Sequence, residues 1–184
     1  MSASALAARR DLLAVTGRFQ PFHCDHLDLV QHALAIADRV LIGVTNADAA
    51  ALRPHPASPH RHLASANPYS FEQRRQLIDA ALTAAGVAAA RYEIVPFPLD
   101  EPGRGPAIVP LGTPQLVRVF SDWEREKARR FAAAGYPPTV LNGDASSRVS
   151  GADIRVAMQA GQPWQHWVPC GARELLQRWQ GRAQ

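Results

Sequence analysis

Short apolar runs alternate along the chain with segments in which apolar residues recur every three or four positions. The runs predict five strands, at 11–17, 39–45, 92–97, 116–121 and 139–142. The helical spacing predicts helices at 23–37, from 70 to a stop at Gly86, at 122–134, and from 150 to a stop at Gly161. A final segment predicts a helical tail with Trp164, Trp167, Leu175, Leu176 and Trp179 on it. The alternation indicates an α/β fold with about five parallel strands and helices on both faces.

Two long connections interrupt this alternation. Segment 46–68 is polar and carries His55, His60 and His62, and we expect it to face solvent or a substrate. The three histidines could also bind a metal, as in a metal-binding regulatory protein, although no fourth ligand is apparent. Segment 98–114 has a proline at every fourth position, which argues against a helix. It predicts a stiff, partly extended loop, which either forms the wall of a substrate pocket or is a proline-rich surface connection.

The length of 184 residues suits one domain over 1–184, with a flexible N-terminus at 1–10. These first residues lack the apolar core of a signal peptide, and no apolar run is long enough to span a membrane. Cys24 and Cys170 lie far apart, which indicates a reducing cytoplasm. The net charge of +4 comes almost entirely from scattered arginines, with Lys127 the only lysine. We therefore expect neither a nucleic-acid nor a membrane partner.

The stretch Gly17–His26 is the strongest candidate for chemistry. A strand, a glycine turn and a helix start follow one another there, and the first N–H groups of a helix attract anions. His23 and His26 lie three positions apart, so both imidazoles can donate to one anion. Near the C-terminus, Ser150 is placed to cap a second helix with Asp153 in its first turn.

Two signatures carry a resemblance to a known family. GRFQPFHCDH (17–26) resembles the GRFQPxHxGH signature of the nucleotidyltransferase superfamily, and SGADIR (150–155) resembles its SxTxIR element. Residues 67–74, 91–96 and 118–121 are similar to stretches of archaeal-type nicotinamide mononucleotide adenylyltransferases. The likeness covers roughly residues 12–179 and implies a Rossmann-like nucleotidyltransferase fold.

The resemblance implies that a phosphate oxygen of an acceptor attacks the α-phosphate of an NTP in line, with release of pyrophosphate. Mg²⁺ would accompany the NTP. Carried over by position, the residues in contact with phosphate would be His23, His26, Arg18 and Arg155. Further residues that would bind the nucleotide are Gly17, Phe19, Gln20, Ser150, Gly151 and Ile154.

Two departures from the family pattern bear on the substrates. Asp25 replaces the usual glycine of the first signature, and its carboxylate would repel a triphosphate unless it points away or binds the metal. It could instead complement the helix dipole. The loop 98–114 lacks the tryptophan that stacks on nicotinamide in the archaeal-type enzymes.

Three functions therefore stay open. The first is adenylyl transfer from ATP to nicotinamide mononucleotide. The second is cytidylyl transfer from CTP to a small phosphonate, as in the cytidylyltransferases of phosphonate pathways. The acceptor would then be bound by arginines, for which the candidates are Arg53, Arg61, Arg74 and Arg104. The third is a nucleotide-binding module without catalysis, in which Asp25 makes the site inactive. The sequence leaves open whether the protein is a homo-oligomer.

Overall fold

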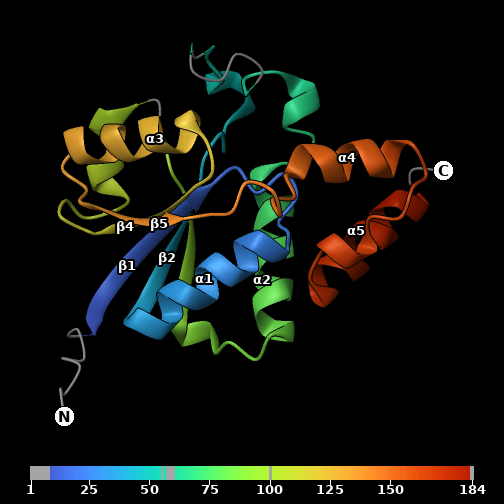
Figure 1. Ribbon diagram of the computed structural model, residues 1–184, viewed down its shortest axis with the longest axis horizontal. Helices are drawn as coiled ribbons and strands as arrows, with labels where there is room; N and C mark the ends of the chain where they lie inside the picture. Colours follow the sequence, from blue (N-terminus) through green and yellow to red (C-terminus); the bar gives the residue numbers. More distant parts are fainter. Residues whose placement is uncertain (1–8, 55, 57–60, 100, 183–184) are drawn as a thin grey trace.

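The computed structural model describes residues 9–54, 56, 61–99 and 101–182. In that part of the chain, five parallel strands form one sheet in the order β3-β2-β1-β4-β5. The strands are β1 (Arg10–Gly17), β2 (Ala37–Val44), β3 (Tyr92–Pro96), β4 (Gln115–Val119) and β5 (Pro138–Asn142). The α-helices are α1 (Cys24–Ile36), α2 (Phe71–Ala84), α3 (Asp122–Ala133), α4 (Gly151–Gln159) and α5 (Cys170–Arg182). The expected α/β fold with a parallel sheet is confirmed (Figure 1).

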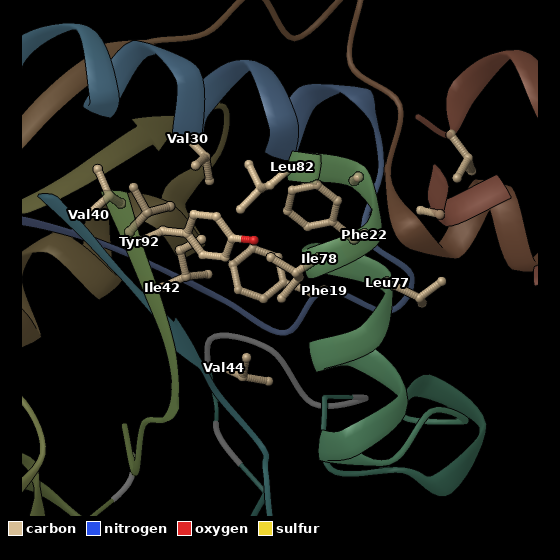
Figure 2. Close-up of a cluster of buried hydrophobic side chains, with 14 of the residues drawn as sticks. Phe19, Phe22, Val30, Val40, Ile42, Val44, Leu77, Ile78, Leu82 and Tyr92 are labelled. Atoms are coloured by element: carbon tan, nitrogen blue, oxygen red, sulfur yellow. The ribbon is translucent and has the colours of Figure 1, made fainter. Parts of the chain in front are cut away.

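Helices cover both faces of the sheet (Figure 1). Alternate residues of a strand point to opposite faces, so Leu13 and Val15 of β1 join one core and Ala14 joins the other. The first core packs the sheet against α1, α2, α4 and α5. Figure 2 shows part of this core, with Val30 of α1 and Leu82 of α2 beside Tyr92 of β3. The second core packs the sheet against α3, where Ala128 and Phe131 are buried.

The predicted helical tail is confirmed from Cys170 on as α5, which packs on α2. Trp164 and Trp167 precede α5, at a short 3₁₀ helix, Gln165–Trp167. Gly171 allows the close approach, because a Cβ there would lie 2.2 Å from the carbonyl oxygen of Ala80. In the described residues no helix is both long and apolar enough to cross a membrane. Cys24 and Cys170 are both free and exposed.

The proline-rich connection differs from the expected extended loop. It contains a six-residue 3₁₀ helix, Pro102–Ala107. Hydrogen bonds from Arg104 N–H to the Glu101 carbonyl and from Ile108 N–H to the Gly105 carbonyl form its turns. Pro106 lies inside the second turn but is the donor in neither bond, so its missing N–H is not needed. The prolines argue against an α-helix but permit these tighter turns.

The first strand begins one residue earlier than predicted. Arg10 already belongs to β1, and the Arg9 side chain forms an ion pair with Asp38 and donates to the Ala37 carbonyl. Residues 1–8 lie outside the described residues, as do His55 and His60 of the segment 46–68.

The strand order creates a topological switch point between β1 and β4. The chain adds β2 and then β3 on one side of β1, and returns to the other side for β4 and β5. Connections after β1 and β4 therefore diverge, and a crevice opens at the carboxyl ends of these strands. β1 and β4 pair only at Ala14 with Gln115 and at Val15 with Leu116. Beyond these pairs, Thr16 and Val117 line a cavity.

Candidate functional site

A cavity of about 490 Å³ lies over the switch point, lined by residues of both signatures. The starts of α1 and α4 form one side, and the first turns of α3 form another. Among the described residues that line it, six are basic and two are acidic: Arg18, Arg61, Arg118, Lys127, Arg148 and Arg155, with Asp25 and Glu124. An excess of positive charge in a crevice attracts anionic ligands.

His23 and His26 lie together at the start of α1. His23 is the N-cap residue, and the centres of the two imidazole rings are 3.6 Å apart. The backbone N–H of His23 donates to Nδ1 of His26 at 3.4 Å. This contact leaves Nε2 as the nitrogen of His26 that carries the proton. The edge contact of the Phe19 ring, 4.9 Å from the His26 ring centre, helps to hold this orientation.

Both histidines are neutral at neutral pH. Burial lowers the pKa of His23 to about 3, with a smaller effect from Arg148. Burial also holds the pKa of His26 well below its usual value, and the charges of neighbouring basic side chains act in the same direction. Each imidazole is therefore a hydrogen-bond donor rather than a cation. The buried Nδ1 of His23 has no hydrogen-bond partner among the described residues, as expected for a group that contacts a ligand.

The turn between β1 and α1 requires Gly17. The backbone of Phe19 has a positive φ of 53°, and its ring folds back over the turn. A Cβ at Gly17 would lie 2.7 Å from that ring, so a larger residue would displace it. A non-glycine residue at positive φ is strained, and such strain is concentrated at functional sites.

The start of α4 faces the same cavity. The Ser150 hydroxyl accepts from the Asp153 N–H, and the Asp153 carboxylate accepts from the Ser150 N–H at 2.8 Å. Gly151 packs against the peptide of Gln20, since a Cβ there would lie 2.5 Å from the Gln20 carbonyl oxygen. The Arg155 guanidinium donates to that same carbonyl. The second signature is thereby attached directly to the first.

Arg18 and Arg155 bring two guanidinium groups close together. Burial lowers the pKa of Arg18 to about 10, and the charge of Arg155 contributes to this shift. The pKa of Arg155 is also lowered by burial. Both groups remain protonated at neutral pH, and two neighbouring cations favour an anion between them.

Of the four arginines expected to bind the acceptor, only Arg61 lines this cavity. Arg104 lies beside a separate cavity of about 110 Å³ and pairs with Glu101. Arg53 is exposed and donates to carbonyls of its own segment, at Ala50 and Leu52.

Arg74 is a structural residue, and its expected contact with the acceptor is corrected here. It is only 1% exposed. Its guanidinium donates to the backbone carbonyls of Arg18, Thr45, Asn46 and Ser70. It thereby holds together the ends of β1 and β2 and the start of α2.

Two other sequence expectations change in detail. Ile154 is fully buried in the first core, so its side chain is not available to a nucleotide. The Gln20 side chain exchanges two hydrogen bonds with the backbone of Tyr69 and positions segment 67–70. Gln20 still lines the cavity, and the structure brings the remaining predicted residues there too, namely Gly17, Arg18, Phe19, His23, His26, Ser150, Gly151 and Arg155. Their roles in binding stay predictions.

The sequence interpretation gave no role to several residues of the cavity wall, among them Trp123, Lys127 and Arg148. Trp123 and Lys127 are four positions apart, so they share one face of α3. The Arg61 guanidinium lies 4.4 Å above the centre of the Trp123 ring. Arg148 pairs with Glu124 at 3.0 Å. The only available signal was the single lysine in a helix that directly follows a strand.

Asp25 lies between the two helix starts. Its carboxylate Oδ2 accepts from the backbone N–H of Val149 at 3.4 Å, and the residue also lines the cavity. The described residues contain no cluster of three or more His, Cys, Asp or Glu side chains that could hold a metal ion. His62 alone of the three loop histidines falls within the described part of the chain, so the metal-binding hypothesis gains no support there.

Comparison with known proteins identifies the family of the chain. The family described as cytidylyltransferase-like matches residues 14–157. The chain is 37% identical over 158 residues to phosphonoformate cytidylyltransferase of Streptomyces viridochromogenes, with 84% of each chain covered. It is 26% identical over 166 residues to nicotinamide-nucleotide adenylyltransferase of Thermococcus kodakarensis, covering 90% of this chain and 81% of the relative.

A solved structure shows the same fold. It is a bifunctional NMN adenylyltransferase/ADP ribose pyrophosphatase from Francisella tularensis, with a TM-score of 0.71 and 21% identity. The match covers 94% of this chain and 50% of that chain, so the present chain spans about half of the bifunctional protein. A second structure of such a protein from the same organism contains AMP and a manganese ion, and has a TM-score of 0.67, 20% identity and coverage of 94% and 49%.

Proposed function

Because the chain belongs to the cytidylyltransferase-like family and is a nucleotidyltransferase, we propose that it transfers CMP from CTP to a small phosphonate and releases pyrophosphate. The 37% identity to phosphonoformate cytidylyltransferase supports this choice, since the adenylyltransferase from Thermococcus kodakarensis is 26% identical. The acceptor would be a compact dianion that needs cations for recognition rather than a large aromatic surface.

The observation that carries the proposal is the convergence of both helix starts and six basic side chains on one cavity. Two anionic substrates repel each other in water, so a catalyst must hold both within one positive field. The starts of α1 and α4 supply backbone N–H groups that lack partners within their helices. Neutral His23 and His26 add donors without adding charge.

We assign the triphosphate to this pair of helix starts. His23 and His26 would donate to its oxygens, and Arg18 and Arg155 would neutralise its charge. An acceptor oxygen would then attack the α-phosphorus in line, and the bond to the leaving pyrophosphate would break. A phosphonate dianion carries no proton to be removed, so the step needs positioning and charge neutralisation rather than a general base.

Arg61 is the candidate acceptor-binding residue that fits the cavity. Its backbone carbonyl accepts from Asn46 at 2.9 Å and from Asn67 at 2.7 Å. These two amides hold the chain at Arg61 while its guanidinium lies over Trp123. A planar guanidinium held in this way can donate two hydrogen bonds to a phosphonate or carboxylate.

The cavity offers few carboxylates, which is consistent with a magnesium ion bound mainly by the phosphates of the nucleotide. Glu124 is engaged by Arg148 and by the Ser121 backbone and hydroxyl. Asp25 is the other acidic residue of the wall, and we propose it as the protein contact of Mg²⁺. Magnesium commonly takes one or two protein carboxylates together with substrate phosphates and waters. When bound, it would neutralise charge on the triphosphate.

Adenylyl transfer to nicotinamide mononucleotide is the second candidate, favoured by one observation. The sequence lacks an aromatic residue in loop 98–114, but Trp123 lies in the cavity wall and offers a ring from another element. In the structure this ring is already covered on one face by Arg61. That arrangement and the higher identity to phosphonoformate cytidylyltransferase are the reasons we rank the phosphonate first.

One matrix of reactions tests the proposal: ATP, CTP, GTP and UTP, each with phosphonoformate, two further small phosphonates and nicotinamide mononucleotide, at millimolar Mg²⁺, with pyrophosphate as the readout. Turnover confined to CTP with a phosphonate is expected. Turnover confined to ATP with the mononucleotide would establish the second candidate instead. Nucleotide binding without pyrophosphate release from any pair would indicate a module without catalysis.

A further part of the proposal concerns where the reaction takes place. We propose that the protein acts in the cytoplasm, since both of its exposed cysteines are free thiols. Comparing reducing and non-reducing mass analysis of the protein as isolated from its source tests this directly, because a disulfide there would contradict it.

A further inference from the structure

Lys127 lies at the point where β1 and β4 stop pairing and the sheet opens into a crevice. We infer that Lys127 is a catalytic residue, and that its ammonium group donates to the phosphoryl group that is transferred from the nucleotide to the acceptor. The inference rests on the proposed nucleotidyl transfer and adds a residue that belongs to neither signature.

The position follows from the strand pairing. β1 and β4 stop pairing after Val15 and Leu116, so the floor of the crevice begins at Thr16. α3 follows β4, and Lys127 reaches from it across the crevice to donate to the Thr16 carbonyl at the end of β1. Lys127 and Thr16 both line the cavity. In sheets of this kind, ligands bind in this crevice, at the switch point.

The transferred group must lie near the middle of the cavity. His23, His26 and Arg155 at the helix starts line the same cavity as Lys127, and so do Arg61 and Trp123. The charge of Lys127 lowers the pKa of His26, and the charge of Arg61 lowers the pKa of Lys127, so the ammonium is close to both groups. Lys127 is therefore near the residues proposed to bind the triphosphate and near the residue proposed to bind the acceptor. We infer that it lies at the reacting phosphorus.

The surroundings of Lys127 also favour a ligand anion. Its Nζ is 5.5 Å from the centre of the Phe131 ring. The carboxylate of Glu124, whose charge raises the pKa of Lys127, is itself paired with Arg148. Burial lowers the pKa of Lys127 to about 7, and Arg61 contributes to that shift. An ammonium in such a setting is stabilised when an anion arrives beside it.

The chemical role follows from the balance of the reaction. An oxygen lone pair of the acceptor forms a new bond to the α-phosphorus, and the bond from that phosphorus to the bridging oxygen breaks. Pyrophosphate leaves with the electron pair of the broken bond. Negative charge on the non-bridging α-oxygens must be stabilised through the transition state, and an N–H donor of Lys127 supplies this without transferring a proton.

The first test compares Lys127→Met with Arg129→Met in the full-length protein. Methionine keeps an unbranched chain and removes the charge. Arg129 is a cation of the same helix that lies on the surface beside Glu126, with 74% of its side chain exposed. For Lys127→Met we expect kcat for pyrophosphate release to fall about 100-fold, with a much smaller change in the KM of the nucleotide. Arg129→Met should retain wild-type kcat. An unchanged kcat in folded Lys127→Met overturns the inference.

The second test does not depend on how a variant folds. Lys127 is the only lysine, so acetylation by an N-hydroxysuccinimide ester can modify one side-chain amine, and peptide mass analysis separates it from the N-terminal amine. The amine attacks the ester carbonyl, an amide forms and N-hydroxysuccinimide leaves. Mg²⁺ with CTP at ten times its Kd should slow acetylation of Lys127 about tenfold, because mainly free protein reacts.

Acetylated wild-type protein should have lost pyrophosphate release in proportion to the fraction of Lys127 modified. Full activity of the acetylated protein, or no protection by the nucleotides that it turns over, overturns the inference. Failure of the proposed function would give a different result. Wild-type protein would release no pyrophosphate from any pair in the reaction matrix, and the role of Lys127 would then be refuted along with the proposed function. An active wild type with an active Lys127→Met variant removes only the role of Lys127.

Discussion

The Asp25 carboxylate accepts a hydrogen bond from the backbone N–H of Val149, with 3.4 Å between Oδ2 and N. This contact joins the first turn of α1 to the residue that precedes the cap of α4. The two helix starts proposed to hold the triphosphate are therefore linked through the one position at which the first signature departs from its family. The carboxylate points toward an N–H group, which reduces the repulsion expected between Asp25 and a triphosphate.

Asp25→Asn should raise the Mg²⁺ concentration needed for half-maximal activity by about tenfold. The amide oxygen can still accept from Val149, so the link between the helix starts is retained while the negative charge is removed. Initial rates over a magnesium titration at saturating CTP measure the effect. An unchanged magnesium requirement together with a lower KM for CTP would contradict the metal contact, and would show that the carboxylate only repels the nucleotide.

His26→Ala should lower kcat for pyrophosphate release by 10²–10³-fold, roughly the effect of removing one donor from a charged transition state. The imidazole is half-buried, and its Nδ1 is already held by the His23 N–H, so the remaining N–H is available to the triphosphate. His166→Ala is the matched control, because His166 is exposed and is not part of the cavity wall. Wild-type turnover by folded His26→Ala would remove the histidine pair from the mechanism.

The fold was largely predictable because its signals are periodic. The five apolar runs and the intervening helical spacing each appear as predicted elements in the parallel sheet. The proline segment 98–114 was less predictable, since proline disfavours the interior of an α-helix but can lie within a short 3₁₀ helix, as Pro106 does. Local rules therefore identified the elements more reliably than the connections.

The candidate site was predictable only where its residues lie in contiguous signatures. A signature does not show which of its side chains turn inward, so Ile154 was assigned to the nucleotide although it is buried in the core. Arg74 illustrates the same limit, because the sequence shows a helical arginine but not the four carbonyls around it. Lys127 and Trp123 reach the cavity through the direction of α3, which depends on tertiary packing.

Arg74→Ala should lower the free energy of unfolding by about 3 kcal/mol, because it leaves buried backbone carbonyls without donors. Denaturant unfolding followed by circular dichroism measures this. Arg75→Ala is the control on the next residue of α2: its side chain is exposed and pairs with Glu72, an interaction that solvent screens. A similar loss of stability in both variants would contradict the structural role of Arg74 and return it to the candidates for acceptor binding.

The activity should also depend on pH through Lys127. Its pKa is lowered from the usual 10.5 to about 7, mainly by burial, so the ammonium is lost as the pH rises through about 7. The charged groups that face it are Arg61, which lowers this pKa, and Glu124, which raises it, while His26 is neutral over this range. Since kcat/KM reports the ionisations of free enzyme and free substrates, its pH profile should fall on the alkaline side in the wild-type protein.

The pH profile of kcat/KM for Lys127→Met distinguishes ionisation of the enzyme from ionisation of its substrates. The nucleotide and the phosphonate ionise identically in both assays, so any limb that they cause persists in the variant. We expect the alkaline limb near pH 7 to be absent from the residual activity of Lys127→Met, and kcat to show that limb at a higher pH than kcat/KM in the wild type. The second shift follows because a bound anion favours the protonated amine. An alkaline limb of equal position in both proteins would assign it to the substrates and would leave Lys127 without a titration that affects the rate.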